Sequence, residues 1–109
     1  MVELRLRHVV KIAPTRVLVL VHGDRRYRVT TGPFVIGRAW SSNLVLLDSE
    51  VSRRHAVVTR RNGSYYLTDL GSASGIEYKG MRIDNKRIDE GDVFLIGRHE
   101  LRFTYRGEH

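Results

Sequence analysis

The 109-residue sequence contains no cysteine, which excludes disulfide bonds and thiolate chemistry. No segment repeats apolar residues at helical spacing for three turns, so no substantial helix is expected. The longest uninterrupted apolar run is residues 17–21, far short of the roughly 20 residues that a membrane-spanning helix needs. The N-terminus also lacks the apolar stretch of a signal peptide. We therefore expect no membrane association and a cytoplasmic location.

The composition is that of one globular domain, with 41% hydrophobic and 28% charged residues. The net charge of +7 is uneven, because seven of the 19 basic residues and two of the 12 acidic residues fall within residues 1–28. Most of these basic residues alternate with apolar ones, as on the solvated face of a half-buried strand. A basic surface that attracts nucleic acid is the disfavoured alternative.

Short segments rich in apolar residues recur along the chain, separated by glycine and other turn residues. The strongest hairpin signal is Asn62-Gly63, which joins two such segments. The expected strands are residues 16–22, 27–29, 34–36, 44–47, 55–61, 64–70, 75–78, 81–83, 92–96 and 100–105. This spacing predicts an all-β fold, an antiparallel sandwich of two sheets.

The N-terminal residues precede these strands and could form an extra strand, a linker to a neighbouring domain or a dimer contact. Residues 2–12 alternate between apolar and polar side chains, which predicts a further amphipathic strand. Pro14 follows and cannot donate to a strand ladder. We therefore divide the chain into residues 1–13, an extension or extra strand, and residues 14–109, the sandwich domain.

Three motifs lie where predicted strands run into loops. Gly37-Arg38 comes first, Ser52 and His55 follow at a spacing of three, and a glycine-rich turn spans residues 69–75. An arginine and a serine hydroxyl brought together by loops offer charge-assisted donors to a phosphate group. Taken alone, Arg38 has a simpler interpretation as an exposed side chain paired with Asp48 or Glu50. The joint order and spacing of the motifs favours the phosphate site.

This pattern closely resembles the forkhead-associated (FHA) domain, whose signature is Gly-Arg, Ser-x-x-His and a Gly-Ser-Thr-Asn-Gly-like turn. The resemblance covers about residues 16–105 and implies a two-sheet β-sandwich that binds phosphothreonine peptides, and thereby phosphothreonine-containing proteins, without a cofactor. It also implies that Arg38, Ser52 and Arg53 contact the phosphate. His55 would brace the loops, and Gly37 and Gly75 would support the site. Such domains commonly sit inside larger proteins.

The chain departs from the FHA pattern in its third motif. Ser74 stands where the family usually has Asn, whose amide clamps the bound peptide's backbone, and Ala73 replaces the usual Thr. We expect both residues still to face the peptide, with weaker binding because a hydroxyl replaces an amide. Glu50 matches a position that in some members helps select the third peptide residue after the phosphothreonine. An acidic peptide residue at that third position should therefore be disfavoured. The alternative is a diverged FHA domain that binds a partner, or itself, without phosphate.

Ser52, His55 and Asp69 include the residue types of a catalytic triad, but their arrangement does not favour catalysis. A serine and a histidine three residues apart lie on opposite faces of an extended chain, and no Gly-x-Ser-x-Gly motif is present. The five histidines have no metal-ligand spacing. We predict neither an enzyme nor a metal site, and leave Trp40 unassigned between the binding surface and a buried position at the sandwich edge.

Overall fold

A computed structural model describes residues 15–30 and 32–108 of the chain. Every regular secondary-structure element assigned in these residues is a β-strand. They are β1 (Thr15–His22), β2 (Arg25–Val29), β3 (Phe34–Gly37), β4 (Leu44–Val45), β5 (Ala56–Arg61), β6 (Ser64–Asp69), β7 (Ile76–Tyr78), β8 (Met81–Ile83), β9 (Asn85–Arg87), β10 (Val93–Ile96) and β11 (His99–Glu108). The extra strand expected in residues 2–12 lies outside the described residues.

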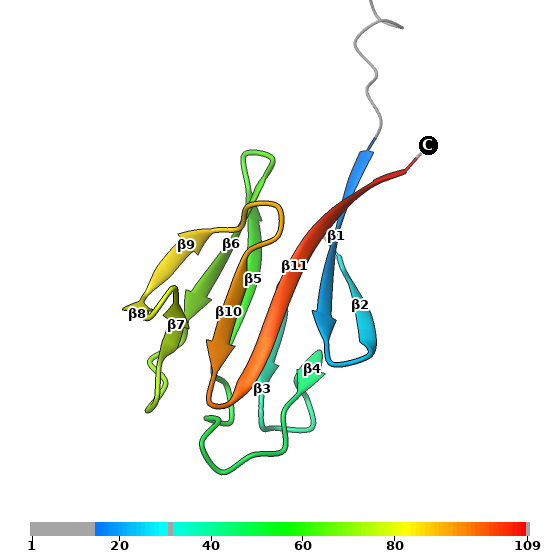
Figure 1. The fold of residues 1–109 in the computed structure, drawn as a ribbon. Helices are drawn as coiled ribbons and strands as arrows, with labels where there is room; N and C mark the ends of the chain where they lie inside the picture. Colours follow the sequence, from blue (N-terminus) through cyan, green and yellow to red (C-terminus); the bar gives the residue numbers. More distant parts are fainter. Residues whose placement is uncertain (1–14, 31, 109) are drawn as a thin grey trace, which may run out of the picture.

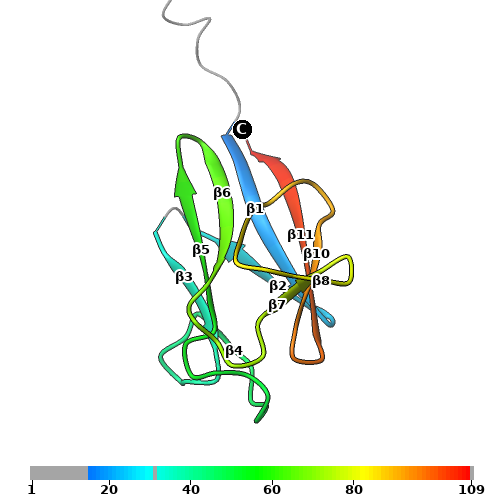
Figure 2. The ribbon, with the colours of Figure 1, turned by 90° about the vertical axis from the view of Figure 1, so that its left-hand side faces the viewer.

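The strands form two sheets that face each other (Figures 1 and 2). One sheet has six strands in the order β2-β1-β11-β10-β7-β8, and the other has five in the order β4-β3-β5-β6-β9. The predicted all-β two-sheet sandwich is confirmed. Within the part of the chain that is described, no helix is long and apolar enough to cross a membrane.

Alternating side chains on the two longest strands build much of the core. β1 pairs with β11 in antiparallel register along most of its length, with Leu20 opposite Phe103. Leu18 and Leu20 of β1 and Leu101 and Phe103 of β11 are fully buried between the sheets. Burying one large apolar side chain contributes about 1.5–3 kcal/mol. The sandwich is thus held by its interior, and the loops at its ends are free to carry function.

The predicted hairpin at Asn62-Gly63 is present. β5 and β6 pair in antiparallel register from Ala56 opposite Asp69 to Arg61 opposite Ser64. Asn62 and Gly63 have φ angles of 50° and 82°, the left-handed backbone that a two-residue hairpin turn requires. The hairpin fixes the ends of both strands, and so places the loop after β6 beside the loop before β5.

Both edges of the five-stranded sheet differ from the prediction. β9 is not expected from sequence, because Asn85–Arg87 has no strand-favouring residue; it pairs with β6 at the sheet edge. β4 is shorter than expected and lies parallel to β3, not antiparallel. The chain leaves this strand after Leu46, whose carbonyl accepts a hydrogen bond from the N–H of Asp48 at 3.0 Å.

The loops that carry the three motifs gather at one end of the sandwich. The connections from β3 to β4, from β4 to β5 and from β6 to β7 all lie at the lower end in Figure 1, with the β10–β11 hairpin beside them. β1 begins and β11 ends at the opposite end. A ligand at the motif loops would therefore be well separated from the start of β1 and the end of β11.

Candidate functional site

The first two motifs lie side by side because their backbones are hydrogen-bonded. The N–H of Arg38 donates to the carbonyl of Ser52 at 3.0 Å, and the N–H of Ala39 donates to the carbonyl of Arg53 at 3.1 Å. The N–H of His55 donates to Ile36 at 3.0 Å. These bonds extend the pairing of β3 with β5 beyond the ends of both strands. Arg38 and Ser52 are therefore held together by backbone geometry.

Gly37 permits this close approach. A Cβ atom built at Gly37 would lie 2.2 Å from the carbonyl oxygen of Arg53, far inside any real contact. Any other residue would push the segment carrying Ser52 and Arg53 away from β3. The Gly-Arg motif thus combines a backbone requirement at its first position with a cation at its second.

His55 joins the second motif to the third. Its ring is fully buried, its Nδ1 accepts the N–H of Ser52 at 3.0 Å, and its Nε2 lies 2.7 Å from the carbonyl oxygen of Gly75. Since an N–H only donates and a carbonyl only accepts, the ring carries its proton on Nε2 and is neutral. The ring thus bridges two loops in the way that the resemblance implies.

The turn at residues 69–75 is organised by its own side chains. The Asp69 carboxylate accepts hydrogen bonds from the N–H groups of Gly71 and Ser72 and from the Ser72 hydroxyl. The buried Ser72 hydroxyl in turn accepts the N–H of Gly75 at 2.9 Å. Gly75 has a φ of 81°, and a Cβ there would lie 2.5 Å from Nε of Arg82. The backbone conformation therefore favours glycine here, and a Cβ would also displace the Arg82 side chain.

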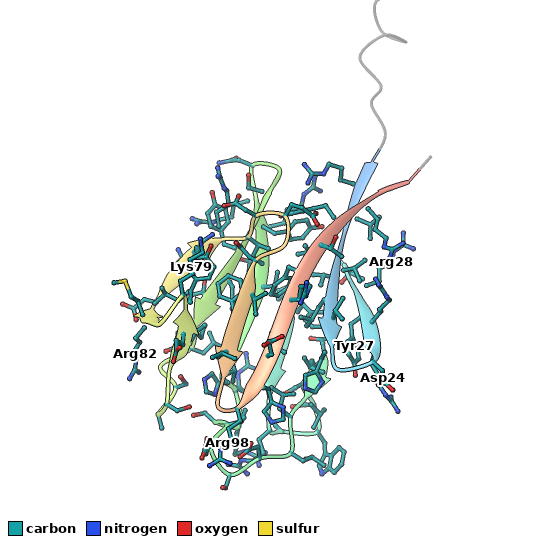
Figure 3. The ribbon with its side chains drawn as sticks, viewed as in Figure 1. Asp24, Tyr27, Arg28, Lys79, Arg82 and Arg98 are labelled. Atoms are coloured by element: carbon teal, nitrogen blue, oxygen red, sulfur yellow. The ribbon has the colours of Figure 1, made fainter. Side chains whose placement is uncertain are left out.

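Sequence reasoning assigned no role to Ser72 or Arg82. The guanidinium of Arg82, on β8, donates to the carbonyl of Ser72 at 3.3 Å. Figure 3 shows Arg82 on the β7–β8 side of the molecule. The spacing Asp69-x-x-Ser72 is a usable signal for a side-chain-capped turn. The contact from Arg82 depends on the pairing of β8 with β7, which no local pattern reveals.

Ser52 has a fixed position and an available proton. Its hydroxyl oxygen accepts the N–H of Ala73 at 3.1 Å, and its own N–H is used by His55. Within the described residues the Ser52 hydroxyl donates to no other group. A hydroxyl that is oriented by one accepted bond and has an unused O–H is suited to donate to an anion.

Arg38 is half-buried and tethered through one nitrogen. Its Nε donates to the carbonyl of Val51 at 3.0 Å, and the described residues offer its two terminal nitrogens no further hydrogen bond. Pairing with Asp48 or Glu50 does not occur. The Asp48 carboxylate accepts the N–H of Glu50 at 2.9 Å, and the Glu50 carboxylate lies 3.9 Å from Arg98. The N–H donors of both terminal nitrogens of the Arg38 guanidinium therefore remain available.

Arg53 shares a surface hollow with Arg38. The hollow is open, has a volume of about 490 Å³ and is lined by Arg38, Ala39, Trp40, Leu47, Asp48, Ser49 and Arg53. The neighbouring Arg54 is also exposed but does not line it. Of these two neighbouring arginines, only Arg53 therefore borders the hollow.

His99, at the start of β11, braces the loop before Ser52 and is itself in contact with His22, at the end of β1. The ring nitrogens of His22 and His99 are 3.1 Å apart, and the second nitrogen of His99 lies 3.2 Å from the Asp48 carboxylate. Burial, and secondly the charge of His99, lower the pKa of His22 from its usual 6.5. The Glu50 N–H, and after it the His99 ring, keep the pKa of Asp48 below 3.8.

The contacts among His22, His99 and Asp48 predict that the folded state loses stability on mild acidification. Because the pKa of His22 is lower in the folded state, the folded state binds fewer protons, and stability decreases as the pH falls below about 6.5. We expect the urea midpoint to decrease between pH 7.5 and 5.5, and to decrease less in His22→Gln. An equally steep decrease in the variant would contradict this prediction.

The comparisons with known proteins agree with this geometry. The model of the FHA domain family matches residues 34–97. The FHA domain-containing protein FhaB of Mycobacterium tuberculosis is 41% identical over 87 residues, which are 76% of this chain and 56% of that protein. The chain belongs to the FHA domain family. It spans about half the length of this curated relative.

Solved structures of FHA domains share the fold. One, from a study of phosphothreonine-dependent FHA domain interactions, has 27% identity and a TM-score of 0.75, covering 81% of this chain and 95% of its own. The EmbR protein of Mycobacterium tuberculosis, in complex with a low affinity phosphopeptide, has 31% identity and a TM-score of 0.78, covering 85% of this chain and 26% of its own. FHA domains bind phosphothreonine peptides.

An FHA domain is a non-catalytic binding module, and the geometry here agrees. His55 accepts the backbone N–H of Ser52, not its hydroxyl, so no base is aimed at a nucleophile. Among residues 15–30 and 32–108, no three His, Asp or Glu side chains are grouped to hold a metal ion.

The third motif is where this FHA domain differs from the family pattern. Ala73 and Ser74 are exposed, and the Ser74 hydroxyl donates to the carbonyl of Glu50 at 2.8 Å. The hydroxyl therefore joins two loops, and only its acceptor lone pairs remain for a ligand. An asparagine amide would offer both a donor and an acceptor at longer reach.

Proposed function

We propose that this FHA domain binds phosphothreonine peptides, with the phosphate held by Arg38, Ser52 and Arg53. The observation that carries the proposal is that the side chains of Arg38 and Ser52 are both fixed in position and both keep unused hydrogen-bond donors. Each is positioned by a bond to backbone, Nε of Arg38 to Val51 and the Ser52 oxygen to the N–H of Ala73, and each keeps unused donors. Such donors form charge-assisted hydrogen bonds to a phosphate without a rearrangement of the loops.

We propose that the backbone of the bound peptide contacts the turn that contains Ala73 and Ser74. Glu50 would contact a peptide side chain that flanks the phosphothreonine. The Ser74 oxygen would accept one peptide N–H, and no side-chain amide stands there to donate in return. One lost hydrogen bond of about 0.5–1.5 kcal/mol weakens binding by roughly two- to twelvefold. The proposed partner is a phosphothreonine-containing protein in the cytoplasm. Binding of this partner by the FHA domain would depend on phosphorylation and serve signalling.

Titration calorimetry against degenerate peptide pools tests this function. Three pools would be compared, containing phosphothreonine, phosphoserine or unphosphorylated threonine at the fixed position. Heat from the phosphothreonine pool alone is the expected result. Equal heat from the phosphorylated and unphosphorylated pools, with the domain shown to be folded by circular dichroism, would overturn the proposal.

One observation favours a second candidate, an FHA domain that binds a partner or itself independently of phosphate. The Ser74 hydroxyl is already used between the two loops, so the usual clamp on a peptide is reduced. The absence of binding heat with all three peptide pools would favour this candidate. Sedimentation analysis at rising concentration would then test self-association directly.

A further inference from the structure

Two large apolar side chains stand exposed beside the proposed phosphate site. Trp40 has 79% of its surface exposed and Leu47 has 64%, whereas most large apolar side chains of this domain are buried in the core. Both line the hollow that Arg38 and Arg53 share. Apolar walls next to unused cationic donors are typical of a site that binds an amphipathic ligand.

The backbone that carries Trp40 is held firmly. The preceding residue, Ala39, is buried, its N–H donates to Arg53 at 3.1 Å, and its carbonyl accepts the N–H of Ser42 at 2.9 Å. Asn43 closes the same loop, with its N–H donating to the carbonyl of Val35 at 2.8 Å and its side chain accepting the N–H of Val35 at 2.8 Å. Trp40 is thus displayed by an ordered loop, so its exposure is a property of the fold.

Leu47, which also lines the hollow, is held in a comparable way. It lies between Leu46, whose N–H donates to Gly37 at 2.8 Å, and Asp48, whose N–H donates to Leu46 at 3.0 Å. The Asp48 carboxylate also lines the hollow, but it is occupied by the N–H of Glu50 and by the His99 ring. The guanidinium groups of Arg38 and Arg53 outnumber this one carboxylate, so the hollow is net cationic beside its apolar walls.

We infer that this hollow is a subsite for a large apolar side chain that precedes the phosphothreonine by up to three residues in the bound peptide. The inference rests on the proposed function. Arg38 belongs both to the hollow and to the proposed phosphate site, so the occupant must lie near the phosphothreonine in sequence. Glu50, proposed to face residues after it, does not line the hollow, which assigns the occupant to the preceding side. Extended chain rises about 3.3 Å per residue, so three residues reach about 10 Å.

Trp40 is the only tryptophan of the chain, so its fluorescence reports directly on this subsite. Two sets of phosphothreonine peptides would be titrated, one with alanine at every flanking position and one with a single leucine moved from three residues before the phosphothreonine to three residues after it. We expect a leucine before the phosphothreonine to tighten binding about tenfold and to shift the Trp40 emission to shorter wavelength.

Two variants separate the subsite from the phosphate site. In calorimetry, which does not need the tryptophan that this variant lacks, Trp40→Ala should lower the affinity for the best leucine peptide to that for the alanine peptide, whose own affinity stays unchanged. Met81→Ala is the matched control, because Met81 is 70% exposed and does not line the hollow; it should leave both affinities unchanged.

The outcomes distinguish the two proposals. If leucine and alanine peptides bind equally, or if leucine helps only after the phosphothreonine, the subsite is overturned and the phosphothreonine function stands. The subsite is also overturned if Trp40→Ala leaves the leucine preference intact. If neither peptide set nor the degenerate phosphothreonine pool binds, the proposed function is overturned and the subsite with it.

Discussion

Replacing Arg38 with alanine is expected to lower the affinity for a phosphothreonine peptide at least about a hundredfold, because hydrogen bonds to a charged group contribute about 1.5–3 kcal/mol each. The guanidinium is half-buried and held by Val51, so its two unused nitrogens would already be in position when a phosphate binds. The bond to Val51 is also lost, which should lower the free energy of unfolding by only about 1 kcal/mol. Calorimetry and urea unfolding measure the two effects separately.

Two further variants make the result specific. Arg54→Ala removes an exposed arginine that lies outside the hollow, and should change the affinity by less than about twofold. Arg38→Lys keeps the charge but not the planar fork, and should bind with an intermediate affinity. Retention of full affinity by a folded Arg38→Ala domain would move the phosphate elsewhere and would contradict the assignment of Arg38.

Much of the fold could be predicted because its signals are local. The turn residues Asn62 and Gly63 and the uninterrupted apolar run at residues 17–21 of β1 identify strands without knowledge of their partners. β9 was missed because its strand conformation comes from the partner it pairs with, β6, and from burial of the following Ile88. The parallel pairing of β4 likewise depends on where the chain returns, which periodicity does not encode.

The candidate site divides in the same way. Gly37, Ser52, His55 and Gly75 could be selected because their motifs keep the order and spacing that resemble the FHA signature, and the resemblance implies their roles at the site. The part played by Arg82 could not, since its contact with the 69–75 turn needs β8 to lie beside β7. Exposure of Trp40 was equally hidden, because a single tryptophan is more commonly buried, and only the ordered loop around it displays the ring.

The second large effect is expected from Gly37→Ala, which should lower the free energy of unfolding by about 3 kcal/mol or more. The added Cβ would meet the Arg53 carbonyl oxygen at 2.2 Å, and both groups belong to hydrogen-bonded backbone that cannot rotate away. The segment carrying Ser52 and Arg53 must shift, so phosphopeptide affinity should fall together with stability. Urea unfolding followed by circular dichroism measures the first loss and calorimetry the second.

Gly32→Ala is the matched control for this prediction, since it adds the same methyl group close to the start of β3. A Cβ at Gly32 would have no atom within 4 Å, and its φ lies outside the left-handed range. Substitution at such a compatible position typically raises stability by about 0.4–1 kcal/mol, because alanine has less conformational freedom in the unfolded chain. If Gly37→Ala proved as stable as Gly32→Ala, the loop after β4 would be able to move away from β3. Rigid backbone contact would then not be what holds Ser52 beside Arg38.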